Sequence, residues 1–419
     1  MQLLKRLKSL RADRKGNVLI LAAAAMPLIV GSAGLALDTI QLSLLKRHLQ
    51  RAADSAALAG AYAKAQDGGF DIQAAVNKAL AFNDAFPLST ATTTQPTSGT
   101  HANRAVKVDL AASRPLPFMS FFTKTPPIIN VSATAALVYS GKYCMIALDE
   151  TEGTGITFEG SSEVNMGCGV ISNRSGPQSV IVNGSKAEIR ASPIAGVGGV
   201  PGSSGYQSPT LLLPYSLKQE DPFKNLPDPP TFPTCGDEIT DSSPAPIPYE
   251  QGGGAGCYRG MDVNKAMTLT PGTYFLKGNL TLNANANITA HGVTLVFTSD
   301  ALTNTDTLPK ITIDGNAKLD LKAPSDPTNP YDGVAIYYDR RAATLSPGPV
   351  IAGNSNLKME GALYFPSQDM TLAGHSSMAS TCIQLVARRL TFTGTTTINN
   401  SCDSGGADRF DVKWVRLVA

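Results

Sequence analysis

LTLNANANITA (residues 280–290) carries a pattern that indicates the fold class. The same pattern is present in ITIDGNAKLDL (residues 311–321). Aliphatic and polar residues alternate, a short polar turn follows, and the alternation then resumes. Alternation with a period of two predicts a half-buried β-strand, and Gly, Asn and Ser favour tight turns. The same pattern recurs in ITFEGSSEVNM (156–166), VIVNGSKAEIR (180–190), VIAGNSNLKME (350–360), MTLAGHSSMAS (370–380) and LTFTGTTTINN (390–400).

The spacing of the turns predicts how these repeats are arranged. Gly353, Gly374 and Gly394 follow one another at intervals of 21 and 20 residues. A repeat of this length matches one coil of a β-solenoid, in which neighbouring coils pair as strands and alternate aliphatic side chains point inward. We therefore predict a mainly β chain whose residues 141–419 form a parallel β-helix-like (β-solenoid) domain.

A proline-rich stretch interrupts the repeats. Residues 201–250 hold 11 of the 28 prolines, including the run LPDPPTFP. Proline cannot donate a ladder hydrogen bond, so this composition favours extended loop structure. We interpret the stretch as an insertion that either covers an exposed end of the stacked strands or forms a mobile linker.

Composition narrows the class of protein further. A chain of 419 residues is long enough for two or three domains. Its 35 basic and 33 acidic residues give a net charge of +2, which favours neither nucleic acid nor a polybasic lipid-binding surface as a partner. Only 16% of the residues are charged, against about 25% in soluble domains, which disfavours a helical cytosolic enzyme.

The amino terminus predicts a membrane anchor. Residues 1–15 hold six basic residues and one acidic residue, and residues 16–37 hold no charge. These 22 residues span about 33 Å as a helix, enough for a hydrocarbon core of about 30 Å. The basic flank places residues 1–15 in the cytoplasm and the rest of the chain outside it. The alternative is a cleaved signal peptide, although the apolar run exceeds the usual length of about 7 to 15 residues.

The region after the span, residues 38–140, is predicted as a membrane-proximal α+β module. A second helix is expected over residues 71–85, a polar loop over 87–103, and paired strands around 106–110 and 129–137. The first helix carries a seam of small and apolar residues at alternating spacings of three and four: Leu42, Leu45, Leu49, Ala52, Ala56, Ala59 and Ala63. Such a seam packs on its own domain, which we favour, or on a partner helix, including that of a second copy of the chain.

The cysteines predict disulfide bonds. All six lie in the exported region and none forms a CxxC motif: Cys144, Cys168, Cys235, Cys257, Cys382 and Cys402. An even number of exported cysteines favours three disulfides, and intervals of 24, 22 and 20 residues within successive pairs favour sequential pairing. Six free thiols in a reducing compartment are the alternative.

The sequence contains no strong motif for catalysis or for cofactor binding. No phosphate-binding loop, nucleophile elbow or HExxH helix is present, and the four histidines are dispersed, so we expect no cofactor and no metal site. Asp149 ends an apolar run, as metal-binding aspartates can, but the hydroxyl residues of a D-x-S-x-S site do not follow it. If the solenoid acted on polysaccharides, the candidate residues would be Asp314, Asp339, Arg340, Arg341 and Asp369. We favour solvated turn charges for these.

The amino-terminal sequence RKGNVLILAAAAMPLIVGSAGLALD, followed by LLKRHLQRAADSAALAGA, resembles the TadE/TadG-like proteins of bacterial Flp (tight adherence) pilus assembly. The anchor signature is carried by Gly16, Asn17, Pro27, Gly34 and Asp38, and the pattern continues through Leu49, Gln50, Ala52, Ala53, Asp54, Ala56, Ala57, Leu58, Ala59 and Gly60. The phrases CMIALD, MGCGVISN, DPFKNLPDPP, TLTPGTYFLKGNLTL and GALYFPSQDMTLAG resemble the later part of TadG-related proteins that lack a von Willebrand A domain.

This resemblance implies a non-enzymatic component of pilus assembly or anchoring that supports adhesion. It would be a single-pass protein of the bacterial inner membrane, with an extracytoplasmic carboxy-terminal domain and other Tad machinery proteins as partners. Prepilin processing would require a glutamate five residues after Gly16, where Leu21 stands, so a permanent anchor is favoured over a pilin. An envelope protein that binds or degrades glycans is the alternative.

Overall fold

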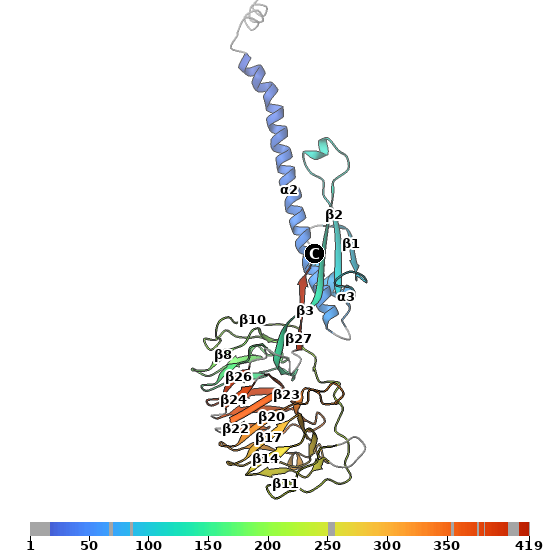
Figure 1. Cartoon of the computed structure of the whole chain (residues 1–419). Helices are drawn as coiled ribbons and strands as arrows, with labels where there is room; N and C mark the ends of the chain where they lie inside the picture. The colour runs from blue at the N-terminus through green and yellow to red at the C-terminus, as the bar shows by residue number, and fades with distance from the viewer. Residues whose placement is uncertain are drawn as a thin grey trace, which may run out of the picture. The chain divides into compact units, whose positions relative to one another are not determined.

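The computed structural model describes residues 17–66, 70–83, 87–249, 256–352, 356–374, 377–380, 382–400 and 410–418. The chain divides into two compact units. The first unit comprises Met1–Val138 together with Trp414–Ala419, and the second comprises Tyr139–Lys413. Among the described residues, one long apolar helix and one short α-helix are present, and most other elements are strands, as the sequence pattern predicted (Figure 1).

The described residues of the first unit include two α-helices. Helix α2 (Asn17–Ala65) runs without interruption through 49 residues, including Pro27, so the apolar run and the seam that follows it form one helix. Helix α3 (Ile72–Phe82) begins after Asp71, whose side chain accepts a hydrogen bond of 2.8 Å from the Gln73 backbone N–H. This is an N-cap that satisfies one of the free donors of the first turn.

The strands of the first unit are antiparallel. β2 (Ala105–Ser113) pairs with the first half of β3 (Ile128–Ala147), which confirms the predicted strand pair, and the 3₁₀ helix η2 (Met119–Phe121) lies in the connection between them. β1 (Leu88–Thr94) pairs with β2, so the prediction of a loop over 87–103 is wrong for these residues. Nearly all of β1 is exposed, and a strand exposed on both faces shows no apolar alternation, although its threonines favour extended backbone.

The core of the first unit lies between α2, α3 and the antiparallel strands. Alanines of α2 pack against Val106, Val108 and Leu110 of β2 and against Val76 of α3. The chain returns to this unit through β27 (Phe410–Leu417), and the Val418 N–H donates a 2.8 Å hydrogen bond to the Thr134 carbonyl. The boundary expected from the sequence would assign these last residues to the second domain, whereas Trp414–Ala419 group with the first unit.

Within the described residues, the strands of the second unit pair in parallel, in three ladders. The first ladder contains, in order of pairing, β12 (Cys257–Tyr258), β15 (Gly272–Leu276), β18 (Val293–Phe297), β21 (Val334–Tyr338), β23 (Asn356–Ala373), β25 (Ile383–Phe392), β3, β6 (Gly169–Ser172), β9 (Ile194–Gly196) and β10 (Leu212–Leu213). The second contains β14 (Ala266–Leu269), β17 (Asn287–His291), β20 (Lys318–Lys322), β23, β24 (Ser377–Ser380), β26 (Thr397–Asn400), β5 (Glu163–Asn165) and β8 (Glu188–Arg190).

The third ladder has two segments. One contains β11 (Ile239–Thr240), β13 (Met261–Val263), β16 (Leu280–Leu282) and β19 (Ile311–Ile313), and the 3₁₀ helix η3 (Thr305–Thr307) precedes β19. The other contains β22 (Val350–Ala352), β23, β25, β4 (Ile156–Phe158) and β7 (Val180–Val182), with β22 beside β19. Figure 1 shows β8, β26, β24, β20, β17 and β14 one above another.

The strands do not stack in the order of the chain. β4 and β5, among the first strands of the second unit, pair on one side with β7 and β8 and on the other with β25 and β26, near the end of the unit. The first repeat therefore lies in the middle of the ladders, between the second repeat and the last one. The proline-rich stretch contains β10, at one end of the ladders, and β11, at the other, and the segment between these two strands connects the two ends.

Repeated side chains fill the interior of the second unit and repeated glycines form a corner. The rings of Phe158 and Phe392, on paired strands, stack with centroids 5.0 Å apart. At the corner, Gly160 has a φ of +67° and Gly394 a φ of +77°, which favour glycine. A Cβ on Gly160 would lie 2.6 Å from the Gly394 carbonyl oxygen, so these turns stack too closely for a side chain.

Candidate functional site

The amino-terminal half of α2 is an exposed apolar helix. Among its large side chains, Ile20 is 69% exposed and Leu28 is 75% exposed. The helix is long and apolar enough to cross a membrane. Of the predicted anchor signature, Pro27 lies inside this helix and Asn17 is its first residue, whereas Gly16 and the basic segment 1–15 lie outside the described residues.

Gly34 and Asp38, one helical turn apart on α2, hold the connection between β2 and β3. Asp38 is buried, and one of its carboxylate oxygens accepts hydrogen bonds from the backbone N–H groups of Phe118 at 3.0 Å and Met119 at 2.5 Å. The Phe118 ring lies over Gly34 so closely that a Cβ there would approach it to 2.2 Å. Glycine thus makes room for the ring, and the carboxylate binds the turn that follows it.

The predicted seam lies mostly inside the first unit. Five of its residues are buried, namely Leu45, Leu49, Ala52, Ala56 and Ala63, whereas Leu42 and Ala59 are half-buried. Leu49, Ala52 and Ala56 belong to the cluster that packs on β2, β3 and α3. Most of the seam is therefore buried within the first unit, and whether its remaining surface binds a partner helix stays a prediction.

Two of the predicted disulfides are present. Cys144 is bonded to Cys168 and Cys235 to Cys257, with Cα–Cα distances of 5.9 and 4.8 Å. Cys382 is also disulfide-bonded, and its predicted partner Cys402 lies outside the described residues. Disulfides of this kind are characteristic of oxidising compartments outside the cytoplasm.

Asp149 occupies the centre of a charge cluster that joins the first and last repeats. Its carboxylate accepts hydrogen bonds from Arg174 of the β6 end and from Arg389 of β25 at 2.7 Å, and Arg388 lies 3.2 Å away. Arg388 also pairs with Asp369 of β23. Burial alone would raise the pKa of Asp149, but hydrogen bonds from Thr151 and Arg389 and the charge of Arg174 lower it to about 2.

The arginines of this cluster were missed at the sequence level. The doublet Arg388–Arg389, directly after an apolar run, was a usable signal for a charged strand end. Its partner Asp149 lies 239 and 240 residues away along the chain, and the pattern of the repeats does not show that these two strand ends meet.

Asp339, Arg340 and Arg341, considered above as catalytic candidates, hold the proline-rich stretch. Arg340 donates hydrogen bonds to the backbone carbonyls of Lys224 at 2.7 Å, Phe223 at 2.9 Å and Leu226 at 3.1 Å. Arg341 bonds the buried Asp339 at 2.7 Å and the Pro229 carbonyl at 3.0 Å. These contacts hold residues 223–229 against the strand end that carries Arg340, so this part of the stretch is not a mobile linker. Other parts of the stretch lie at the ends of the ladders, where β10 pairs with β9 and β11 pairs with β13.

The remaining candidate residues for catalysis or metal binding do not form a common site. Asp314 is exposed in a turn, where it accepts a 2.9 Å hydrogen bond from the Gly315 N–H, while Asp369 belongs to the cluster around Asp149. His291 lies 3.0 Å from Asp320, and His375 lies outside the described residues. Within the described residues, no three His, Cys, Asp or Glu side chains gather as they would around a metal ion.

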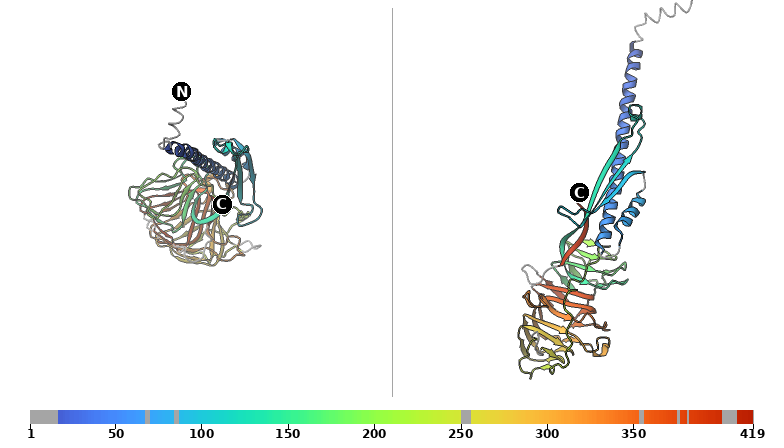
Figure 2. Two further views of the ribbon diagram at one scale, coloured as in Figure 1. Left: turned by 90° about the horizontal axis from the view of Figure 1, so that it is seen from above. Right: turned by 90° about the vertical axis from the view of Figure 1, so that its right-hand side faces the viewer.

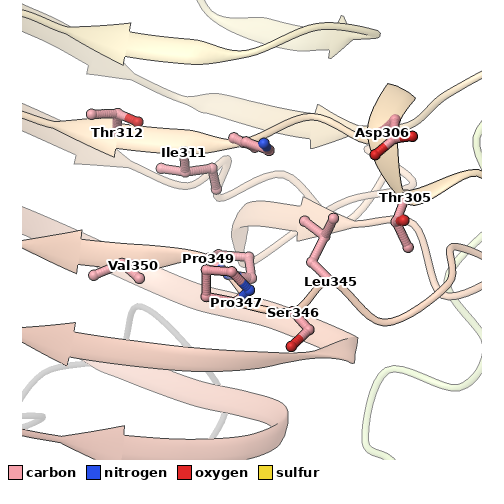
Figure 3. A pocket seen from close by; sticks show the side chains of 11 residues that line it. Thr305, Asp306, Ile311, Thr312, Leu345, Ser346, Pro347, Pro349 and Val350 are labelled. Carbon is pink, nitrogen blue, oxygen red and sulfur yellow. The ribbon is translucent and has the colours of Figure 1, made fainter.

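The pockets that the described residues of the second unit form include the following two. One, of about 300 Å³, lies between η3, the start of β19 and the loop Leu345–Val350 (Figure 3). It carries one acidic and one basic side chain, Asp306 and Lys310, among small polar and apolar residues. The other, of about 450 Å³, is lined by aromatic and acidic residues and by the proline-rich stretch, including Tyr249, Phe275, Tyr331, Asp228, Asp326 and Asn329.

These features define a chain with an apolar amino-terminal helix of membrane-spanning length, an α+β unit and a disulfide-bonded unit of parallel strands. The comparison with protein families refines this class. Residues 16–65 match the family model described as putative Flp pilus-assembly TadE/G-like, so the chain carries a Tad domain that coincides with α2. A comparison with curated proteins finds no match to the chain.

Proposed function

We propose that this protein is a non-enzymatic, membrane-anchored component of Flp (Tad) pilus assembly or anchoring that supports adhesion. Residues 16–37 span the bacterial inner membrane once, residues 1–15 remain in the cytoplasm, and the rest of the chain is extracytoplasmic. The observation that carries the proposal is the match of residues 16–65 to the Tad family model, on a helix whose first half is exposed and apolar. The disulfides support an oxidising location for the second unit.

We further propose that residues 141–400 form a parallel β-solenoid. The order of the strands supports this arrangement, because β13, β14 and β15 enter the third, second and first ladders in turn, and β16, β17 and β18 repeat the same order. One repeat of three strands corresponds to one coil. The stacked rings and stacked corner glycines are the side-chain repeats expected from such coils.

The proposed partners are other proteins of the Tad machinery. Much of the alanine seam of α2 is covered by the module itself, so the contact surface lies on the remaining faces of α2 or on the parallel-strand unit. A second copy of the chain is a candidate partner through the exposed face of α2, which includes Leu35, Ile40 and Leu44.

The test is deletion of the gene in its own bacterium, followed by electron microscopy of surface pili and an adherence assay. We expect the deletion to remove pili and adherence, and a plasmid copy of the full chain to restore both. A version in which residues 1–37 are replaced by a cleavable signal peptide exports the same domains without an anchor, and we expect it to restore neither. Normal pili in the deletion strain would refute the proposal.

One observation favours a second function, the binding of an envelope glycan. The pocket beside the proline-rich stretch combines aromatic rings with the carboxylates Asp228 and Asp326, and sugars bind by stacking on rings and by hydrogen bonds to such groups. Calorimetric titration of the full chain with polysaccharide from the same envelope should detect binding that Tyr249→Ala, a change at the half-buried ring of this pocket, abolishes. Binding that is absent, or unaffected by this substitution, would eliminate the second function.

A further inference from the structure

The hairpin that joins β2 to β3 carries two of the most exposed aromatic side chains of the first unit. Phe121 is 83% exposed and Phe122 is 79% exposed, and both belong to the turn that contains η2. Neighbouring Leu116 is buried, so the turn is packed on one side and open on the other. A pair of exposed phenylalanines in an ordered turn indicates a contact surface, because soluble surfaces rarely group large apolar side chains.

The turn contacts α2 at Gly34 and Asp38. The Asp38 carboxylate accepts the backbone N–H groups of Phe118 and Met119, and the Phe118 ring fills the space over Gly34. Figures 1 and 2 show the turn with η2 beside α2. Because Gly34 and Asp38 lie at the end of the uncharged stretch 16–37, the turn lies at the depth where the proposed span leaves the hydrocarbon.

We propose that the hairpin tip, residues 116–124, is a second membrane contact that inserts Phe121 and Phe122 into the outer face of the bilayer. The inference rests on the membrane anchor of the proposed function and adds a surface outside the helix. Lys124, which is exposed and follows Phe122 by two residues, would reach the phosphate groups of the lipids. Gly34 and Asp38 then have a physical role, since they hold the hairpin at interfacial depth.

A phospholipid surface fits these rings better than a protein partner. The turn contacts α2 at Gly34 and Asp38, and exposed apolar side chains of the same part of the helix include Val30, Leu35 and Leu37. A bilayer that surrounds the span must cover these side chains. A turn bound to the same helix at the same depth meets the same lipid. Aromatic side chains with a cationic neighbour are the composition expected at this boundary.

The experiment places a tryptophan at the tip and measures quenching by lipids brominated on their acyl chains. The full chain is reconstituted in vesicles of phosphatidylcholine and phosphatidylglycerol, in a Trp414→Phe background that removes its single tryptophan. Phe122→Trp reports on the tip, Leu28→Trp on the span, and Tyr215→Trp on an exposed site of the second unit. If Trp414→Phe does not fold, the signal is read as the difference between each variant and the parent chain.

We expect Phe122→Trp to be quenched within about twofold of Leu28→Trp and Tyr215→Trp to be unquenched. Adding Gly34→Ala, which displaces the Phe118 ring, should at least halve the quenching at the tip and leave Leu28→Trp unchanged. Quenching at Leu28→Trp without quenching at Phe122→Trp would overturn the membrane contact, leave the anchor intact and point to a protein partner. Quenching at neither position would overturn the anchor as well.

Discussion

Replacing Asp149 by asparagine should loosen the junction between the first and last repeats of the second unit. The substitution keeps the size of the side chain and one hydrogen-bond acceptor but removes the negative charge that faces Arg174, Arg388 and Arg389. The side chains of Asp149 and Arg174 are 6% and 7% exposed, so Arg174 would remain buried without this counter-charge. Glu150→Gln is the matched control, because the Glu150–Lys218 pair is 60% and 52% exposed.

The magnitude follows from two independent estimates. The pKa of Asp149 is lowered from 3.8 to about 2, and at about 1.36 kcal/mol per unit this corresponds to about 2 kcal/mol. Removing one partner of a buried ion pair typically costs about 3 to 5 kcal/mol. Because asparagine retains an acceptor and Arg388 still pairs with Asp369, we expect the lower end, about 3 kcal/mol. An exposed pair contributes about 0 to 1 kcal/mol, which sets the expectation for the control.

Hydrogen exchange measured by mass spectrometry on the full chain tests this prediction locally. The junction is held by backbone bonds such as Leu148 N–H to Ala387 at 2.8 Å and Leu390 N–H to Gly155 at 2.9 Å, so peptides from β25 and from the β3–β4 region report on its opening. A loss of about 3 kcal/mol should speed exchange there by roughly a hundredfold. Exchange in Asp149→Asn that matches Glu150→Gln within about threefold would refute the reasoning.

Three further predictions concern acid stability, the corner glycines and the proline-rich stretch. The pKa of Asp149 is lower in the folded chain than in the unfolded chain, so the stability that its carboxylate contributes is complete above pH about 4 and is lost as the pH falls to about 2. Over this pH range, the urea midpoint of the wild type should therefore drop more than that of Asp149→Asn. Gly160→Ala should lower the free energy of unfolding, measured by urea denaturation, by about 2 kcal/mol or more, because Gly160 has a positive φ and contacts the next corner. The control Gly202→Ala places no atom within 4 Å of the new Cβ and should change this free energy by less than about 0.5 kcal/mol. Arg340→Lys cannot bind three carbonyls in a planar fork, so trypsin should cleave after the exposed Lys224 at least about tenfold faster than in the wild type.

Much of the second unit could be predicted from its repeats. Alternating aliphatic residues identify the strands because one face of each strand is buried, and the ladder registers bring equivalent positions together, as with Leu280 beside Ile311. The turn glycines were informative for a similar reason, since close stacking leaves no room for a Cβ at Gly160. These signals are local, and each repeat carries its own copy.

The features that escaped prediction depend on contacts between distant or exposed parts of the chain. Strand β1 is exposed on both faces, so it has no apolar periodicity. The cluster around Asp149 and the bonds from Arg340 to the proline-rich stretch depend on which strand ends meet, and the repeats are too alike to specify this. The sequence favoured solvated turn charges for Asp339 and Arg341, whereas Asp339 is buried and accepts a hydrogen bond from Arg341, which also donates to the Pro229 carbonyl.

The order of stacking has a topological reason. The chain enters the second unit along β3 and leaves it towards β27, whose last residues belong to the first unit, so the second unit is an insertion whose entry and exit must be close together. If ten parallel strands were stacked in chain order at about 4.8 Å each, entry and exit would be separated by roughly 40 Å. Starting in the middle of the ladders, crossing to the far end through the proline-rich stretch and returning places β25 directly against β3, with Leu385 opposite Met145. The proline-rich stretch and the Asp149 cluster thus both serve to bring the entry and the exit of the second unit together. The proline-rich stretch carries the chain from one end of the ladders to the other, and the Asp149 cluster joins β3 and β25, which meet when the chain returns.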